Sequence, residues 1–292
     1  MNGIILIDKP RDWTSHDVVG KLRRLLKERR IGHSGTLDPM ATGLLVVFVG
    51  RATRAVEFAE ADAKEYIAGL RLGVETDTQD ITGTVLQETA HAVTAEELAA
   101  VLPRFTGPQQ QIPPMYSALK VNGQKLYDIA RKGGEVERKA RDITIHSLSL
   151  EDSSGLEPGD FCLDVTCSKG TYIRTLCHDI GRALGVGGTM SSLRRVRAGA
   201  FHLRDALTLE QVALAAEEGR AEQLLLPVDT LFTAHPSMTL TEKQTKRTLV
   251  GGQFSVTVPD GTYRFYAPDG AFLALGKVEQ GTASTIKSFF EV

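Results

Sequence analysis

The sequence is poor in the features that mark secreted, membrane-spanning or disulfide-bonded proteins. It has three cysteines and one tryptophan in 292 residues, and its 34 basic and 36 acidic residues give a formal net charge of −2. Three cysteines are few and odd in number, which excludes a disulfide framework and indicates a reducing compartment. The longest apolar run, Leu44 to Val49, is far shorter than the ~18 residues that a membrane span needs. The first apolar stretch, Gly3 to Ile7, is followed at once by charged residues, so it predicts no secretory signal. We expect a cytoplasmic protein with no membrane partner.

Several common catalytic motifs are also missing. The glycine-rich segment Gly32 to Gly43 is not closed by Gly-Lys-Ser/Thr, which excludes a P-loop, and Gly185 to Gly188 follows a predicted helix rather than a strand. Cys162 and Cys167 are five residues apart on a predicted strand, so they point to opposite faces and do not form a metal-ligand pair. We therefore expect a protein without a metal or cofactor.

The chain is long enough for about two domains, at ~150 residues per domain. Alternating apolar residues predict strands over 64–72 and 160–168, and helical periodicity predicts a helix from Ile173 to Leu184. Ser15 is the expected N-cap of an earlier helix. Residues 107–142 are rich in Gln and Pro and then basic, with a turn at Asn122-Gly123, which indicates a surface insertion. The texture changes after residue 235 to a capped helix and short strands separated by Pro-Asp-Gly turns. The sequence thus predicts a main domain over 1–235 and a small β-rich domain over 236–292.

Three residues stand out as candidates for chemistry. Asp38 is held extended by Pro39, and glycines on both sides of this segment allow a ligand to approach. Arg174 lies in the first turn of the predicted helix, and a guanidinium beside a buried carboxylate would keep that carboxylate ionised. Tyr66 lies on a strand face and could stack on a base. Each also has an ordinary interpretation: a turn, a solvent-facing arginine and a core tyrosine.

Five segments in the same order resemble the TruB-type tRNA pseudouridine synthases. The principal one runs Gly32-His33-Ser34-Gly35-Thr36-Leu37-Asp38-Pro39-Met40-Ala41-Thr42-Gly43-Leu44-Leu45. The others are Ile7-Asp8-Lys9-Pro10, Lys64-Glu65-Tyr66, Thr76-Asp77-Thr78-Gln79-Asp80, and Ser168-Lys169-Gly170-Thr171-Tyr172-Ile173-Arg174-Thr175; Ser192-Leu193-Arg194-Arg195 is similar to a later family element. The resemblance implies an α+β fold, in which helices flank a mixed or antiparallel sheet. Residues 236–292 resemble the RNA-binding PUA fold more loosely.

The same resemblance implies an isomerase that converts uridine 55 in the T-loop of tRNA to pseudouridine without cofactor or metal. Asp38 corresponds to the essential carboxylate, which adds to the sugar, adds to the base or removes the 2′ proton; the sequence leaves these three routes open. Arg174 corresponds to its partner. Tyr66 corresponds to the residue that stacks on the target base, and it is a candidate for handling the C5 proton.

The resemblance also implies binding residues. Tyr172 and Leu193 correspond to pocket residues that contact the flipped nucleotide, and His33 corresponds to a histidine that supports the flipped-out T-loop. An RNA stem is gripped mainly through its phosphates. Tight basic clusters are therefore expected to contact tRNA, namely Arg23, Arg24, Arg30, Arg194, Arg195 and the segment from Lys120 to Arg141. We expect a monomer, because no apolar helix face or strand edge is left over.

Two other functions are compatible with parts of the pattern. The first is a non-catalytic tRNA-binding protein or tRNA folding chaperone, which Asp38→Asn would distinguish because chaperoning does not need the carboxylate. The second is a glycoside hydrolase with an aspartate nucleophile, which needs a second carboxylate at ~5 Å; Asp77 or Asp80 could nominally serve. The basic clusters and five ordered motifs favour the synthase.

Overall fold

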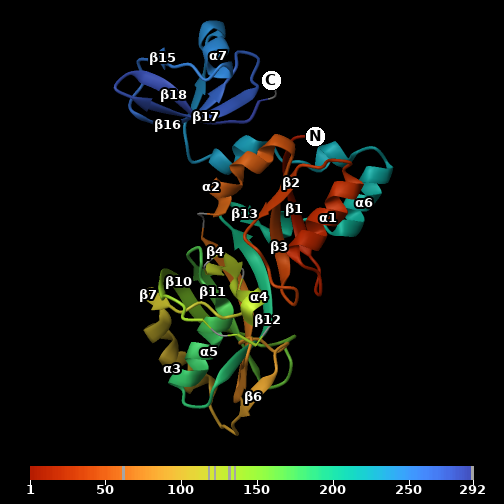
Figure 1. The fold of residues 1–292 in the computed structure, drawn as a ribbon, viewed down its shortest axis with the longest axis vertical. Coiled ribbons are helices and arrows are strands. Elements are labelled where there is room, and N and C mark those ends of the chain that lie inside the picture. The colour runs from red at the N-terminus through yellow and green to blue at the C-terminus, as the bar shows by residue number, and fades with distance from the viewer. Residues whose placement is uncertain (61–62, 118, 122, 131–132, 135, 291–292) are drawn as a thin grey trace.

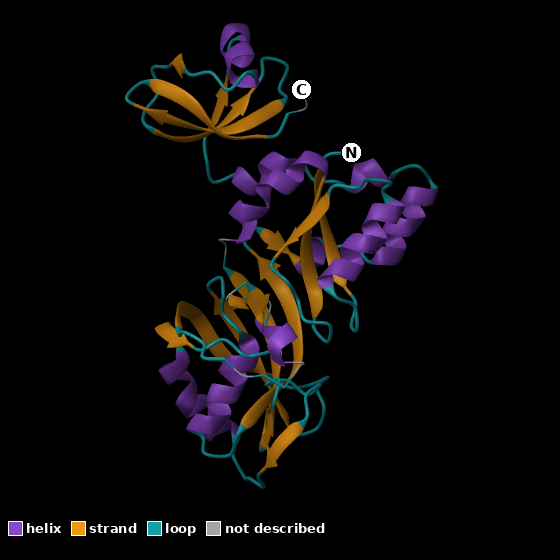
Figure 2. Ribbon diagram, viewed as in Figure 1, coloured by secondary structure: helices purple, strands orange, loops and turns teal. Residues whose placement is uncertain are grey.

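The computed structural model describes residues 1–60, 63–117, 119–121, 123–130, 133–134 and 136–290. The described chain is built around a large mixed sheet, which is followed by a smaller sheet close to the C-terminus (Figures 1 and 2). Helices flank the large sheet, as the α+β fold class requires, so this expectation is confirmed.

The large sheet has nine strands in the order β1-β3-β12-β4-β11-β10-β7, with β2 paired to β3 and β13 paired to β12. Their bounds are β1 Gly3–Lys9, β2 Ile31–Ser34, β3 Thr42–Val49, β4 Lys64–Leu72, β7 Gly107–Gln111, β10 Arg141–Glu151, β11 Asp160–Cys167, β12 Gly188–Ala198 and β13 Phe201–His202. All described pairings in this sheet are antiparallel except that of β12 with β3.

Helices and short hairpins cover the two halves of this sheet. The helices are α1 Ser15–Leu25, α2 Val56–Glu60, α3 Ala95–Val101, α4 Leu126–Ala130, α5 Ile173–Ala183 and α6 Leu209–Glu217, and the 3-10 turns are η1 Gly50–Ala55, η2 Leu102–Phe105, η3 Leu203–Asp205, η4 Ala221–Leu224 and η5 Val228–Phe232. The hairpins are β5 Val74–Thr76 with β6 Val85–Glu88, and β8 Lys120–Val121 with β9 Gln124–Lys125. Within the described ranges, no helix combines the length and apolarity that spanning a membrane demands.

Strand β12 joins the two halves of the sheet, because it pairs with β3 on one side and with β4 on the other. One hydrophobic core lies under β4, β10, β11 and α5, and two further clusters lie around β1 and β3. Figure 1 shows β12 passing from one half to the other. The pairing with β3 requires Gly43, whose φ is +98° and where a Cβ would stand 2.4 Å from the carbonyl oxygen of Arg195.

Several local predictions are confirmed, and two are corrected. Strand β4 has the predicted bounds with Tyr66 on its buried face, and α5 begins at the predicted residue. The N-cap of α1 is Thr14 rather than Ser15, because Thr14 forms a capping box with Asp17. The insertion expected over 107–142 covers only 112–140, since β7 and β10 at its two ends belong to the sheet. Asn122, expected in a turn, lies outside the described residues.

The C-terminal unit is a curled five-stranded sheet in the order β14-β16-β17-β18-β15 with one helix. The bounds are β14 Ser237–Thr239, α7 Glu242–Leu249, β15 Phe254–Ser255, β16 Gly261–Tyr266, β17 Phe272–Glu279 and β18 Thr282–Ser288. It docks on the first unit through a cluster of four aromatic rings. Phe232 of η5 lies 5.3 Å from Phe58, 6.1 Å from Phe272 and 5.6 Å from Phe289, measured between ring centroids. Arg54 also donates a 2.8 Å hydrogen bond to Ser288, so the docking is both apolar and polar.

Candidate active site

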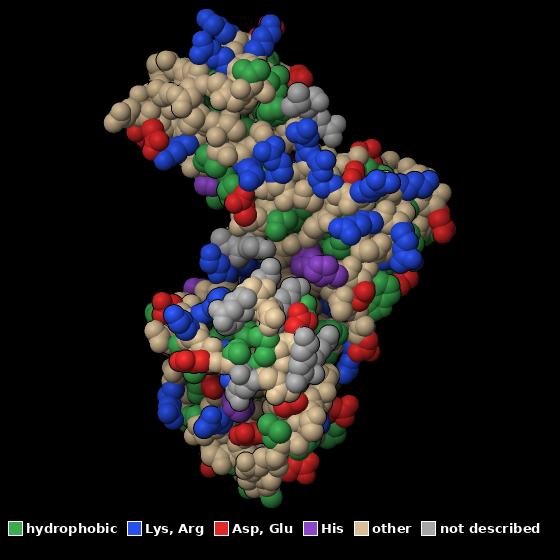
Figure 3. Space-filling view, viewed as in Figure 1, with side chains coloured by type: hydrophobic (Ala, Val, Ile, Leu, Met, Phe, Trp, Pro, Cys, Tyr) green, Lys and Arg blue, Asp and Glu red, His purple; other side chains and the backbone are tan. Residues whose placement is uncertain are grey.

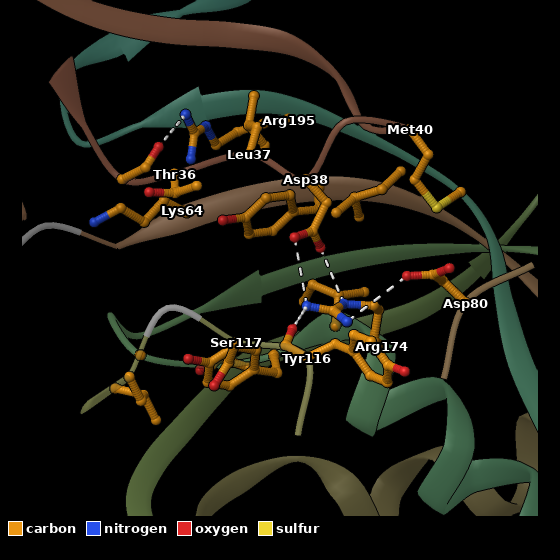
Figure 4. Close-up of a pocket in the computed structure, with 18 of the residues that line it drawn as sticks. Thr36, Leu37, Asp38, Met40, Lys64, Asp80, Tyr116, Ser117, Arg174 and Arg195 are labelled. Carbon is orange, nitrogen blue, oxygen red and sulfur yellow. Dashed lines mark hydrogen bonds and ion pairs between the residues drawn. The ribbon is translucent and has the colours of Figure 1, made fainter. Parts of the chain in front are cut away.

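A cavity of about 950 Å³ opens where the two halves of the large sheet meet (Figure 4). Its walls come from the β2–β3 loop, β4, β12, the start of α5 and the insertion. Five of the six site residues inferred from the sequence line this cavity: Asp38, Tyr66, Tyr172, Arg174 and Leu193. A volume of this size accommodates a ligand as large as a nucleotide.

The loop that carries Asp38 is fixed on both sides of the carboxylate. The Ser15 hydroxyl donates to the carbonyl oxygen of Leu37 at 3.2 Å, and the Leu37 amide donates to the same hydroxyl at 2.9 Å. The fully buried Lys9 ammonium donates to the carbonyl oxygens of Pro39, Pro10 and Trp13 at 3.2, 2.9 and 2.6 Å. Burial lowers the pKa of Lys9 to about 8. Because the Ser15 hydroxyl is bound to the backbone of Leu37, it does not act as a helix cap.

Arg174 is the arginine that faces Asp38. Its Nε lies 3.0 Å from Asp38 Oδ2 and its Nη2 lies 3.4 Å from Oδ1, so the two groups form a forked ion pair. The remaining donors reach the carbonyl oxygens of Thr78 at 3.1 Å and Tyr116 at 2.8 Å. Arg174 is only 5% exposed, so the interpretation of this residue as a solvent-facing arginine is wrong.

Asp80 is a second carboxylate on the same guanidinium, and the sequence placed it near Asp38 only under the glycoside hydrolase alternative. Its Oδ2 lies 3.7 Å from Arg174 Nη1. Its Oδ1 accepts hydrogen bonds from the hydroxyls of Thr78 and Thr82 at 2.9 and 2.5 Å and from the Thr82 amide at 3.0 Å. Because it is buried and already bound on both oxygens, Asp80 orients Arg174 rather than acting as a free acid.

The environment of Asp38 is balanced between opposing effects. Burial raises the pKa of Asp38 above its usual range, and the negative charge of Asp80 acts in the same direction, whereas Arg174 and Lys9 act against the rise. The carboxyl side chain is 36% exposed and faces the cavity. Its ion pair with Arg174 favours the charged form, so the site presents one partly exposed carboxylate that can act on a bound sugar or base.

An aromatic and apolar wall faces this carboxylate. Tyr66 on β4 and Leu193 on β12 are 9% and 8% exposed and border the cavity. Tyr172, the N-cap of α5, makes no side-chain cap of its own; instead, the buried Gln111 side chain binds its backbone. The Tyr172 amide donates to Gln111 Oε1 at 2.8 Å, and Gln111 Nε2 donates to the Tyr172 carbonyl at 3.1 Å.

His33 is the predicted site residue that does not line the cavity. It lies on β2, where its ring meets that of His16 edge-on at 5.4 Å between centroids. Burial, together with the nearby charges of His16 and Arg195, lowers the pKa of His33 to about 4, so the ring is neutral at pH 7. The structure therefore places His33 beside the Asp38 loop but not among the residues that form the cavity wall.

Two arginines of β12 differ from their expected role as exposed RNA contacts. Arg195 is 1% exposed, so the expectation that it contacts tRNA from the surface is wrong. Arg194 is partly exposed, and its guanidinium forms a 2.8 Å ion pair with Asp8. The basic residues of α1 remain at the surface: Arg23 and Arg24 are exposed and Lys21 is half-buried.

The residues that sequence reasoning missed differ in whether any signal could have found them. Asp80 belongs to a segment that the family resemblance already included, so its motif was the signal. Arg195 also belongs to a segment of the resemblance, but its contacts with Gly35 and Leu44 could not be read from it. Gln111 had no signal, because its role depends on a contact with a residue far away in the sequence. Among the residues placed by the structure, no cluster of three or more His, Cys, Asp or Glu side chains could hold a metal ion.

Comparison with known families agrees with this site. Residues 23–173 match the model described as "TruB family pseudouridylate synthase (N terminal domain)", and residues 174–233 match "tRNA pseudouridylate synthase B C-terminal domain". A tRNA pseudouridine synthase B of Syntrophotalea carbinolica is 47% identical over 85% of this chain and 80% of its own length. Its counterpart in Clostridium kluyveri is 40% identical over 99% of this chain and its own full length.

Solved structures show the same fold. A chain from a Cbf5-Nop10-Gar1 complex superposes with a TM-score of 0.74 at 26% identity, over 99% of this chain and 85% of that one. A chain from an H/ACA RNP bound to a substrate RNA that contains 2′-deoxyuridine also has a TM-score of 0.74, at 24% identity and with the same coverage. These matches extend through the C-terminal sheet, which the two family models do not cover.

Proposed function

Because this chain belongs to the TruB family of pseudouridylate synthases and converts uridine in tRNA to pseudouridine, we propose that its target is the uridine at position 55 of the T-loop and that Asp38 is the essential carboxylate. The observation that carries the assignment of Asp38 is its forked ion pair with Arg174 in the cavity. No other carboxylate among the described cavity residues is ion-paired with a buried arginine while remaining more than a third exposed.

The reaction breaks the C1′–N1 bond, turns the uracil in the pocket and joins C5 to C1′. A flipped nucleotide needs a pocket with an aromatic wall and little water. Tyr66 and Tyr172 supply that wall, and Leu193 gives it an apolar edge. We assign Asp38, Arg174 and Tyr66 to the chemistry and Tyr172 and Leu193 to holding the base, with no metal or cofactor. His33 supports the flipped-out T-loop from its place beside the Asp38 loop.

The tRNA contacts are part of the same proposal. The exposed basic side chains of α1 and of the insertion would bind backbone phosphates next to the cavity. The C-terminal unit, residues 236–292, is proposed to be a PUA-like domain that extends the RNA surface; Lys246 and Arg247 lie in the last turn of α7, and basic side chains gather over this helix in Figure 3. Residues 1–235 would form the catalytic domain, and the protein would act as a monomer in the cytoplasm.

The test is release of tritium from tRNA transcripts that carry tritium at uridine C5, measured with the unaltered protein and Asp38→Asn. We expect release by the unaltered protein and loss of at least ~10³-fold in Asp38→Asn, with tRNA affinity retained. Asp12→Asn is the matched control, because Asp12 is exposed at the rim of the same cavity. Equal release by Asp38→Asn would overturn the role of Asp38.

The alternative of a tRNA folding chaperone predicts a different result. A protein that only binds and refolds tRNA would release no tritium, and Asp38→Asn would not alter its effect on tRNA folding. Measuring tRNA folding beside tritium release separates the two functions.

A further inference from the structure

Arg195 is a buried cation without a carboxylate partner. Its Nε donates to the carbonyl oxygen of Leu44 at 2.7 Å, and its Nη2 donates to that of Gly35 at 3.0 Å. Its Nη1 is buried and has no hydrogen-bond partner. Among the described residues, no carboxylate forms an ion pair with it. An arginine stays protonated in proteins, and a buried charge without a counter-charge is costly. A residue of this kind at a cavity wall indicates a negative charge that forms only during the reaction.

Tyr66 is the group placed to carry that charge. It stands directly opposite Arg195 in the antiparallel register of β4 and β12, and both side chains line the cavity. Cross-strand partners of this kind hold their side chains next to each other. Burial raises the pKa of Tyr66, whereas the charge of Arg195 acts in the opposite direction.

The other charged or titratable groups near Tyr66 do not supply the same effect. Asp38 and Cys167 disfavour ionisation of the phenol, and burial raises the pKa of Cys167 to about 11, so this thiol is neutral at pH 7. Lys64 also borders the cavity, but the cation that lowers the pKa of Tyr66 is Arg195. Arg174 is already paired with Asp38 and Asp80.

The isomerisation itself needs a group that passes through an anionic state. Uridine carries hydrogen on C5 and none on N1, and pseudouridine has the reverse, so one proton leaves C5 and one is gained at N1. When the C1′–N1 bond breaks, its electron pair stays on the uracil. If the Tyr66 phenol gives its proton to N1, a phenolate results. After C5 bonds to C1′, the phenolate takes the C5 proton and the phenol is restored, with no net gain or loss of protons.

We propose that Arg195 is a positioning residue that stabilises the Tyr66 phenolate and so permits Tyr66 to carry this proton. The inference rests on the proposed function. A fixed cation in a water-poor pocket stabilises an adjacent anion far more than the same charge does in water, and it needs no rearrangement at the moment of reaction.

The experiment compares single-turnover pseudouridine formation on tRNA with hydrogen or deuterium at C5 of the target uridine. Arg195→Met should slow the reaction about 10- to 100-fold, less than the roughly 10²–10⁴-fold that general acid–base catalysis contributes, because Tyr66 itself remains. It should also raise the C5 isotope effect above that of the unaltered protein, because C5 deprotonation becomes limiting. In a Tyr66→Phe background, Arg195→Met should cause no further loss. A merely structural role predicts an unchanged isotope effect and equal losses in both backgrounds, and would overturn the proposal.

Arg197→Met is the matched control, because Arg197 lies two residues along β12 and forms a 2.7 Å ion pair with Glu65 outside the cavity. Its isotope effect should stay that of the unaltered protein. If Arg195→Met does not fold, Arg195→Lys decides the question. Fluorinating the ring of residue 66 in that variant lowers the phenol pKa and should recover at least part of the lost rate; absence of recovery would overturn the proposal. Failure of the proposed function gives a different result, since the unaltered protein itself would then form no pseudouridine at the target uridine.

Discussion

Replacing Gln111 with leucine tests whether the start of α5 is held from outside the helix. The change removes the side-chain amide that binds both the amide and the carbonyl of Tyr172, at 2.8 and 3.1 Å, and it nearly preserves volume. Tyr172 precedes Ile173 and Arg174, the first residues of α5, and this helix end has no side-chain cap of its own. The Tyr172 amide would then have no protein partner, whereas its carbonyl oxygen would keep the hydrogen bond from the Leu176 amide. The backbone that presents Arg174 to Asp38 would be held less firmly.

The expected loss follows mainly from the unsatisfied Tyr172 amide. Leaving a buried backbone donor or acceptor unsatisfied costs about 1–3 kcal/mol. Because Tyr172 is half-buried at a cavity that water can enter, we expect about 1–2 kcal/mol rather than the upper limit of the range. For a domain of this size that corresponds to a fall in Tm of roughly 2–8 °C. A displacement of about 1 Å at Arg174 would lower kcat by up to about 10²-fold.

Thermal unfolding and single-turnover tritium release measure the two effects. Gln110→Leu is the matched control, because Gln110 is the preceding residue of β7, is exposed and makes only a 3.4 Å contact with Asp142. Gln111→Glu keeps the acceptor for the Tyr172 amide but loses the donor to its carbonyl. Its Tm and its rate should therefore lie between those of Gln110→Leu and Gln111→Leu. If Gln111→Leu has the same Tm and the same single-turnover rate as Gln110→Leu, the hydrogen bonds from Gln111 to Tyr172 contribute nothing and the reasoning is refuted.

Three further predictions concern the remaining contacts. Activity should be lost as pH falls through the raised pKa of Asp38. Asp80→Asn should move this acid limb of the pH–rate profile to lower pH, because it removes a charge that raises the pKa. An acid limb at the same pH as in the unaltered protein, or at a higher pH, would contradict this. Lys9→Met leaves the carbonyl oxygens of Pro10 and Trp13 without the Lys9 donor, whereas that of Pro39 keeps the bond from the Asp12 amide. It should therefore destabilise the fold by about 2 kcal/mol in denaturant titration and lower kcat more than it raises KM. Phe232→Ala should lower the stability of the docked arrangement by about 3–5 kcal/mol and expose the linker near residue 235 to protease. Unchanged cleavage would show that the aromatic cluster does not hold the C-terminal unit.

Local structure was predictable where the pattern was local. The bounds of β4 and the start of α5 follow from alternating and helical periodicity, and the capping boxes at Thr94, Thr208 and Thr241 follow from residues three positions apart. Ser15 was misassigned as a cap because a serine before a helix is an equally good cap in isolation. Its hydroxyl is bound instead to the backbone of Leu37, a contact that no local pattern indicates.

The orientation of the β12 arginines could not be predicted, because the strand is not regular. Its register with β4 shifts between Met190 and Ser192 and again between Arg195 and Arg197. Each shift breaks the alternation from which a sequence assigns the inner and outer faces of a strand. Arg194 and Arg195 are adjacent and therefore point to opposite faces, but the shifts on either side hide which of them faces inward. Arg194 forms a surface ion pair, and Arg195 is the buried cation.

The active site depends on the position of β12 between β3 and β4. On one side, Gly43 of β3 allows the β12 backbone to approach directly after the Asp38 loop, and the Arg195 side chain returns to that loop by donating to Gly35. On the other side, Arg195 stands opposite Tyr66 in β4. One residue of β12 thus connects the backbone that presents the carboxylate with the phenol that faces the base. Because both connections are made through the same strand, a change in its register would move the proposed acid–base group relative to Asp38, and the irregular strand is better explained by the geometry of the site than by the packing of the sheet alone.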